Sequence, residues 1–115
     1  MSEYKIYHNP RCSKSRETLE ILRSKGVEPT IIEYLKTPPS QEEILGILRK
    51  LGGEASQLVR TKEQEFSDSG IDLSSAESVS QGIAATPKLL ERPIVVKKDR
   101  AVIGRPPSNV ETLIS

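Results

Sequence analysis

The only cysteine and the only histidine of this 115-residue chain lie close together near its N-terminus. Cys12 follows His8 by four residues, inside a polar and basic stretch at residues 8–16. A thiolate is a strong nucleophile, and a histidine so near it in the chain can stabilise it as a cation or move its proton. The two residues therefore predict chemistry at sulfur.

The residues on either side of this stretch predict a strand-to-helix loop. Residues 4–7 have the alternating pattern of a β-strand, and an apolar helical spacing begins at Thr18 and Leu19. Cys12 is therefore expected at or just before a helix N-terminus, where free N–H groups and the helix dipole favour negative charge. Such a position lowers the pKa of a thiol and attracts an oxyanion. The loop predicts either sulfur attack on an anionic substrate or thiol exchange.

Both residues also have a purely structural interpretation. A lone cysteine is commonly a small buried hydrophobic residue, and a histidine at a strand end commonly makes one structural hydrogen bond. The charged neighbours Arg11, Lys14 and Arg16 favour a reactive Cys12, because an inert core thiol would lie among apolar residues.

Composition limits the classes of protein to consider. The length predicts one domain over residues 1–115. A single cysteine excludes an intramolecular disulfide and a Cys-based zinc site, so we expect no metal and a reducing compartment. With no apolar signal region and no membrane-spanning run, a cytoplasmic protein is expected. The net charge of +1 and the aromatic fraction of 3% argue against a general nucleic-acid binder.

Hydrophobic periodicity predicts a βαβ unit in the first third of the chain. The first helix is expected to end near Lys25-Gly26, where a cation and a glycine form a C-terminal cap. Residues 30–34 are rich in β-branched side chains and predict a buried strand. Strand, helix and strand in this order favour two parallel strands with a right-handed crossover.

The rest of the chain predicts helices and a hairpin. Ser40 and Glu43 form a capping box that opens a helix ending at Leu51. The predicted elements after it are short helical turns in residues 55–69, a helix at 75–85, a turn at 88–91, strands at 93–96 and 101–103, and a helix at 110–114 capped by Ser108-Asn109.

This order matches a thioredoxin-like α/β layout. It predicts a four-stranded mixed sheet with a βαβ N-terminal half, a β-hairpin C-terminal half and helices on both faces. In that layout the redox loop follows the first strand, and a proline, usually cis, faces it from the start of the third strand. Pro93 stands at that position.

Five blocks of the chain resemble the glutaredoxin-linked arsenate reductases and occur in the same order. They comprise Ile6-Tyr7-His8-Asn9-Pro10 with Cys12, Ser15 and Arg16, then residues 28–39, 58–60, 91–96 and 104–106. The resemblance covers nearly the whole chain and implies both the thioredoxin-like fold and arsenate reduction.

The resemblance also implies roles for individual residues. Cys12 matches the nucleophile, His8 matches the residue that stabilises its thiolate, and Ser15 is expected to hydrogen-bond that thiolate. Pro93 matches the cis proline that faces the thiol.

Three arginines, Arg60, Arg92 and Arg105, match the positions that bind the oxyanion and the reduced product. Planar guanidinium groups would offset the repulsion between a thiolate and an arsenate anion. Each arginine could instead be a solvated surface residue, which is the common state of arginine. Arg60 lies in the part of the chain whose structure is least predictable.

The implied reaction uses no bound cofactor. Cys12 attacks arsenate, glutathione as co-substrate reduces As(V) to As(III) and leaves a mixed disulfide on Cys12, and glutaredoxin resolves that disulfide. A chain with one cysteine cannot resolve its own intermediate, so an external thiol is required. The expected partners are arsenate, glutathione and glutaredoxin, with no nucleic acid or membrane, and a monomer is expected.

Three other interpretations stay open. A relative of this family could act as a thiol oxidoreductase on another substrate. The redox-linked transcription regulators of the same superfamily use a two-cysteine switch, but Ser15 occupies the second position here. A thioredoxin-like interaction domain with an inert Cys12 is the third.

Overall fold

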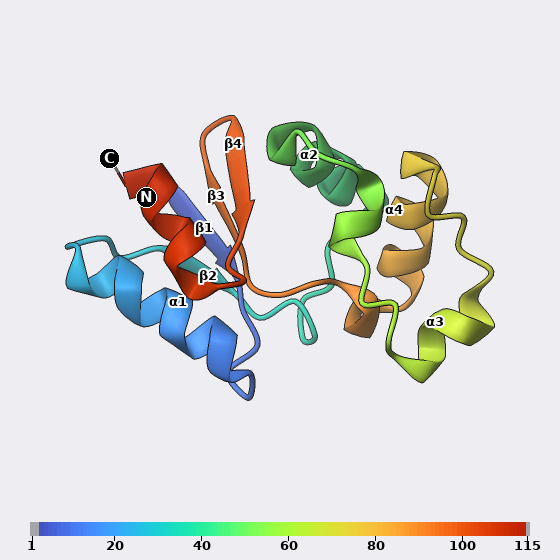
Figure 1. Cartoon of the computed structure of the whole chain (residues 1–115), viewed down its shortest axis with the longest axis horizontal. Helices are drawn as coiled ribbons and strands as arrows, with labels where there is room; N and C mark the ends of the chain where they lie inside the picture. The colour runs from blue at the N-terminus through green and yellow to red at the C-terminus, as the bar shows by residue number, and fades with distance from the viewer. Residues whose placement is uncertain (1–2, 115) are drawn as a thin grey trace. The chain divides into compact units, whose positions relative to one another are not determined.

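The computed structural model describes residues 3–114, which form two compact units (Figure 1). The first, here called the sheet unit, contains residues 3–37 and 92–114. The second, called the helical unit, contains Pro38–Glu91. Whether the chain is one domain stays a prediction.

The sheet unit carries all four strands that the structure assigns between residues 3 and 114. Its elements are β1 (Tyr4–Tyr7), α1 (Ser13–Ser24), β2 (Thr30–Ile32), β3 (Ile94–Lys97), β4 (Arg100–Ile103), the 3-10 helix η3 (Pro107–Val110) and α5 (Glu111–Ile114). The strand order is β2-β1-β3-β4. β1 pairs parallel with β2 and antiparallel with β3, and β3 pairs antiparallel with β4. This mixed sheet confirms the predicted βαβ half and the predicted hairpin.

The register of the sheet brings three chain segments to one end. Tyr7 pairs with Ile94, and Ile94 pairs with Ile103. The segment after β1, the segment before β3 and the segment after β4 therefore meet at the same end of the sheet. His8 continues this end, because its backbone N–H donates to the carbonyl of Ile32 at 2.8 Å.

One face of the sheet packs against α1 and the C-terminal helices (Figure 1). Alternation along β1 turns Tyr4 and Ile6 to this face, because successive strand residues point to opposite sides. The buried residues of this cluster are Tyr4, Ile6, Leu19, Leu22, Val95, Val110 and Leu113. The packing fixes α1 against the sheet and so fixes the loop that precedes α1.

Helix α1 has the predicted boundaries. Cys12 is its N-cap with extended backbone angles, and Lys25 is its C-cap. Gly26 follows with φ of 82°, a left-handed conformation that favours glycine after a helix.

The helical unit is built around two helices that pack on each other. Its elements are α2 (Gln41–Leu51), the 3-10 helix η1 (Ala55–Leu58), α3 (Gln64–Ser69), α4 (Ala76–Ala85) and the 3-10 helix η2 (Pro87–Leu89). Ser40 Oγ accepts from the Glu43 N–H at 3.1 Å, which confirms the capping prediction. Ser75 caps α4 in the same way, through the N–H of Ser78.

Two predictions about local structure were wrong. The strand predicted at residues 30–34 ends at Ile32, and it is an exposed edge strand in which Ile31 is 39% exposed. A β-branched run predicts a strand but does not tell an edge from a centre. The last helical segment begins at Pro107 without a side-chain cap, so Ser108-Asn109 does not cap it. The Asn109 amide instead turns back toward the preceding loop.

The bond between Arg92 and Pro93 is cis, as the layout led us to expect. The bond between Arg105 and Pro106 is cis as well, which the sequence did not indicate. Within residues 3–114, no helix is long and apolar enough to cross a membrane.

Candidate active site

Cys12 lies at the end of the sheet where the three segments meet. Its N–H donates to the carbonyl of Asn9 at 3.0 Å, and its own carbonyl accepts from the N–H of Arg16 at 3.0 Å. The first bond closes the loop after β1, and the second is the first turn of α1. The side chain is partly exposed, so the thiol is accessible to a small substrate.

The surroundings of Cys12 favour its thiolate. Partial burial raises the pKa of the thiol, but the backbone N–H groups of Ser15 and Lys14 and the guanidinium of Arg92 outweigh it and hold the pKa below its usual value. Within residues 3–114, the Cys12 side chain makes no N-cap hydrogen bond to α1 that meets the usual geometric criteria. The N–H groups of Ser15 and Lys14 nevertheless lie close enough to the sulfur to stabilise its negative charge. The position at the start of α1 thus has the effect that the sequence predicted.

Arg92 and Arg105 both reach the sulfur. Arg92 hydrogen-bonds Cys12 through its side chain, and Arg105 Nη2 lies 3.5 Å from Cys12 Sγ. The two arginines are also linked, because Arg105 Nε donates to the carbonyl of Arg92 at 2.8 Å. Two guanidinium groups beside one thiolate would offset the repulsion that an incoming oxyanion meets there.

His8 acts on the site through Ser15. The ring is buried, and its Nδ1 lies 2.6 Å from Ser15 Oγ, which also accepts from the N–H of Asn9 at 3.1 Å. Burial, with Arg23 and Arg16 nearby, lowers the pKa of His8 despite the opposing charge of Glu33. His8 is therefore mainly neutral at pH 7, which disfavours the imidazolium alternative.

Ser15 contributes mainly through its backbone. Its hydroxyl is engaged by His8 and Asn9, while its N–H is the group that favours the Cys12 thiolate. The hydroxyl thus ties the strand end to the first turn of α1.

A compact loop after β4 holds Arg105 in place. Gly104 N–H donates to the carbonyl of Pro93 at 2.9 Å, and a Cβ on Gly104 would lie 2.6 Å from Thr18 Oγ1. Asn109 Nδ2 donates to the carbonyls of Ile103 at 3.2 Å and Arg105 at 3.0 Å. Sequence reasoning missed Gly104 and Asn109, since a glycine against a cis proline and an asparagine that bonds backward leave no local pattern.

Arg60 lies in the helical unit. Its Nη1 is 3.2 Å from a Glu91 carboxylate oxygen and its Nε is 3.3 Å from a Glu63 oxygen. Its backbone N–H donates to the carbonyl of Leu89 at 2.8 Å, next to the isolated bridge between Val59 and Leu90. The structure thus brings five of the predicted site residues and Pro93 together in the sheet unit, and holds Arg60 among carboxylates in the helical unit.

The grouped residues can do thiolate chemistry on an anion. In the described part of the chain, no three His, Cys, Asp or Glu side chains lie close enough together to hold a metal ion. The reactive group of the site is the Cys12 sulfur with its backbone and guanidinium partners.

The chain matches a family model and several named proteins. The ArsC family model matches residues 7–113. An arsenate reductase of Haemophilus influenzae is 46% identical over 91% of this chain and 93% of its own length. An arsenate reductase of Neisseria meningitidis serogroup B is 40% identical over 99% of this chain and 100% of its own length.

A solved structure shows the same fold. The arsenate reductase from Vibrio cholerae superposes with a TM-score of 0.88 at 43% identity, covering 95% of each chain. The mixed four-stranded sheet with flanking helices is therefore the fold of that protein too, which confirms the predicted thioredoxin-like class.

Proposed function

The chain belongs to the ArsC family, and from that membership we propose that it is an arsenate reductase, an oxidoreductase supplied with electrons by glutathione and glutaredoxin. The observation that carries the proposal is the Cys12 sulfur with the Arg92 guanidinium bonded to it and the Arg105 Nη2 at 3.5 Å. A thiolate with guanidinium groups around it suits attack on a tetrahedral oxyanion.

The first step forms a bond between sulfur and arsenic. The Cys12 thiolate attacks arsenate, and one arsenate oxygen leaves as water after it takes up protons from solvent. Arg92 and Arg105 hold the remaining oxygens and reduce the repulsion between two negative groups. The oxidation state of arsenic does not change in this step.

The second step transfers two electrons to arsenic. A glutathione thiolate attacks the Cys12 sulfur and forms a disulfide with it. The bond between sulfur and arsenic breaks, and its electron pair stays on arsenic, which leaves as arsenite. Glutaredoxin then attacks the glutathione sulfur of the mixed disulfide and restores the Cys12 thiolate.

The cysteine count supports an external reductant. Cys12 is the only cysteine, so the disulfide that follows arsenate reduction must include a sulfur from another molecule. In this proposal glutathione supplies that sulfur. The protein is proposed to act as a monomer in the cytoplasm.

We assign the remaining predicted residues to supporting roles. His8 and Ser15 fix the loop that presents Cys12, through the 2.6 Å contact of Nδ1 and Oγ. That Arg60 is the third oxyanion ligand stays a prediction of the family resemblance, and within the helical unit its guanidinium is paired with two carboxylates, at least one of which it must release to bind an anion.

The proposal is tested by arsenate-dependent oxidation of NADPH, coupled through glutathione reductase with glutathione and a glutaredoxin present. Turnover is expected with the parent protein and is expected to fall below about one thousandth of the parent rate in Cys12→Ser, which lacks the nucleophile. Arg100→Gln, an exposed arginine in β4, is the control and should keep the parent rate.

A folded parent protein that shows no arsenate turnover, although iodoacetamide still alkylates Cys12 rapidly, would overturn arsenate as substrate. That result would favour a thiol oxidoreductase with another substrate. Slow alkylation at neutral pH would instead favour an interaction domain with an inert cysteine.

A further inference from the structure

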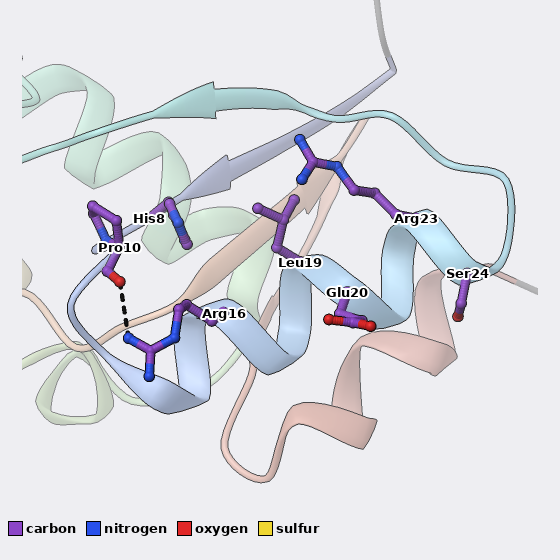
Figure 2. Close-up of a pocket in the computed structure, with 7 residues that line it drawn as sticks. All are labelled: His8, Pro10, Arg16, Leu19, Glu20, Arg23 and Ser24. Carbon is purple, nitrogen blue, oxygen red and sulfur yellow. Dashed lines mark hydrogen bonds between the residues drawn. The ribbon is translucent and has the colours of Figure 1, made fainter.

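A surface pocket of about 660 Å³ opens on the sheet unit along one side of α1. Its lining residues are His8, Pro10, Arg16, Leu19, Glu20, Arg23 and Ser24 (Figure 2). The volume falls within the range of roughly 300–1,000 Å³ that is usual for small-molecule sites. The steps proposed at the Cys12 sulfur assign no role to Arg16, Glu20 or Arg23 of this pocket.

The pocket begins one helical turn from the nucleophile. The N–H of Arg16 bonds the carbonyl of Cys12, and Arg16 Nη1 donates to the carbonyl of Pro10 at 2.9 Å, a bond drawn in Figure 2. His8 lines the pocket and also contacts Ser15 in the thiol loop. A molecule bound here therefore lies beside the loop that presents the sulfur.

The charges of the pocket follow one face of the helix. Arg16, Glu20 and Arg23 are spaced by four and three residues, so they leave α1 from the same face and are here called the row. Figure 2 shows that their ends diverge, with Arg16 turned toward Pro10 and Arg23 turned toward the strands. The charges of Arg16 and Arg23 both help to lower the pKa of His8, although their guanidinium groups lie apart, Arg16 beside Pro10 and Arg23 beyond Leu19 (Figure 2). Arg23 also forms an exposed ion pair with Glu28, through Nε at 3.1 and 3.3 Å and Nη2 at 3.0 Å, so a ligand carboxylate must displace part of this pair.

Arg16 and Glu20 have no partner of opposite charge among residues 3–114 in the structure. The row thus offers two cationic groups and one carboxylate, and Leu19 and Pro10 add apolar surface to the pocket. A ligand that matches this pattern carries two carboxylates and one ammonium group on a short flexible backbone.

We propose that this pocket binds the external thiol as a zwitterionic peptide, with its carboxylates on Arg16 and Arg23 and its ammonium group on Glu20. The proposal rests on the proposed function, which requires an external thiol at Cys12 and takes glutathione as that thiol. Glutathione carries two carboxylates and one ammonium group, so it matches the charges of the row.

The binding arm of the test needs no arsenate. S-methylglutathione, which cannot form a disulfide, is titrated into the ¹⁵N-labelled protein, and amide shifts are followed by NMR. We expect saturable shifts at Arg16, Glu20 and Arg23 in the parent, and shifts that need a several-fold higher concentration in Arg16→Gln. The proposal would be overturned if these three residues showed no shifts, or if Arg16→Gln reached the same shifts at the same concentration as the parent.

The kinetic arm compares two thiols. The KM for glutathione is expected to rise about three- to fivefold in Arg16→Gln and about twofold in Arg23→Gln, as expected for exposed charge pairs. The KM for 2-mercaptoethanol, which carries no charge, should stay at the parent value in both variants. Arg100→Gln is the matched control, because Arg100 pairs with Lys97 at the opposite end of the sheet from the thiol loop.

Two measurements separate thiol binding in the pocket from a disturbed thiol loop and from protein docking. The alkylation rate of Cys12 in Arg23→Gln should match the parent, since Arg23 lies three helical turns from the thiol and a change there would indicate a disturbed loop. An unchanged glutathione KM with a raised KM for glutaredoxin would overturn the proposal and assign the row to protein docking. Absence of turnover with every thiol would overturn the proposed function. The amide shifts with S-methylglutathione would still show whether the pocket binds glutathione.

Discussion

The two compact units of the chain hold their predicted anion-binding arginines in opposite ways. In the sheet unit, Arg92 bonds the Cys12 sulfur and Arg105 approaches it at 3.5 Å. In the helical unit, Arg60 lies between Glu63 and Glu91, at 3.3 and 3.2 Å. A guanidinium already paired with carboxylates must lose part of that interaction before it binds another anion. Arginines with the same predicted role are therefore not equally prepared for a substrate.

Among the three arginines, Arg92 is expected to cause the largest loss of kcat/KM for arsenate when it is replaced. Arg92→Ala should lower kcat/KM for arsenate by about 10- to 100-fold, since a hydrogen bond to a charged group contributes about 1.5–3 kcal/mol. The steady-state rate at several arsenate concentrations gives this value. A loss no larger than that of Arg100→Gln would show that Arg92 does not act at the sulfur.

Arg105→Ala is expected to have the next largest effect. Its guanidinium is exposed and its contact with sulfur is long, so a loss of about tenfold in kcat/KM for arsenate is expected. Arg105→Lys should recover only part of it, because an ammonium group cannot donate both to Cys12 and to the Arg92 carbonyl in the same geometry. Full recovery with lysine would mean that charge alone is needed.

Arg60 tests the other side of the comparison. Arg60→Gln should raise the KM for arsenate by about threefold or less, since the guanidinium must leave a carboxylate first. The same change should lower the free energy of unfolding by about 1 kcal/mol, because two partly exposed ion pairs are lost. Urea unfolding and arsenate kinetics measure the two effects. A KM change as large as that of Arg92→Ala would remove the distinction between the units.

The smallest effect concerns the loop that holds Arg105. Asn109→Ala removes two hydrogen bonds to loop carbonyls and should lower kcat/KM for arsenate by about threefold. Asn109→Leu removes the same donors at similar side-chain volume and without adding a charge, and it should behave alike. Full activity in Asn109→Leu would show that packing, not hydrogen bonding, holds the loop.

Much of the sheet unit could be predicted from the sequence. The strand at residues 4–7, the helix that begins after Cys12 and the hairpin near residues 93–103 all have local signals, namely alternation, helical spacing and turn residues. Strand order then follows from few physical rules, because a βαβ unit and a hairpin pair in limited ways. The meeting of Cys12, Arg92 and Arg105 is a consequence of that order.

The features that could not be predicted depend on contacts far apart in the chain. The exposure of Ile31 depends on which strands flank β2, and the role of Asn109 depends on where the Arg105 carbonyl lies in space. Arg60 has no distinguishing local pattern, and its carboxylate partners are three and 31 residues away. Hydrophobic periodicity carries no information on such pairs.

The central claim is that the sheet unit, through Arg92, keeps Cys12 as a reactive thiolate. The most direct test is the rate of Cys12 alkylation by iodoacetamide between about pH 5 and pH 9, in the parent, Arg92→Gln and Arg100→Gln. The pKa of Cys12 in the parent should lie below the pKa of a free cysteine. Because Arg92 favours the thiolate, Arg92→Gln should move the pKa upward and slow alkylation at neutral pH, with the rates converging at high pH. A parent pKa at or above that of free cysteine, or the same pKa in Arg92→Gln, would contradict the claim.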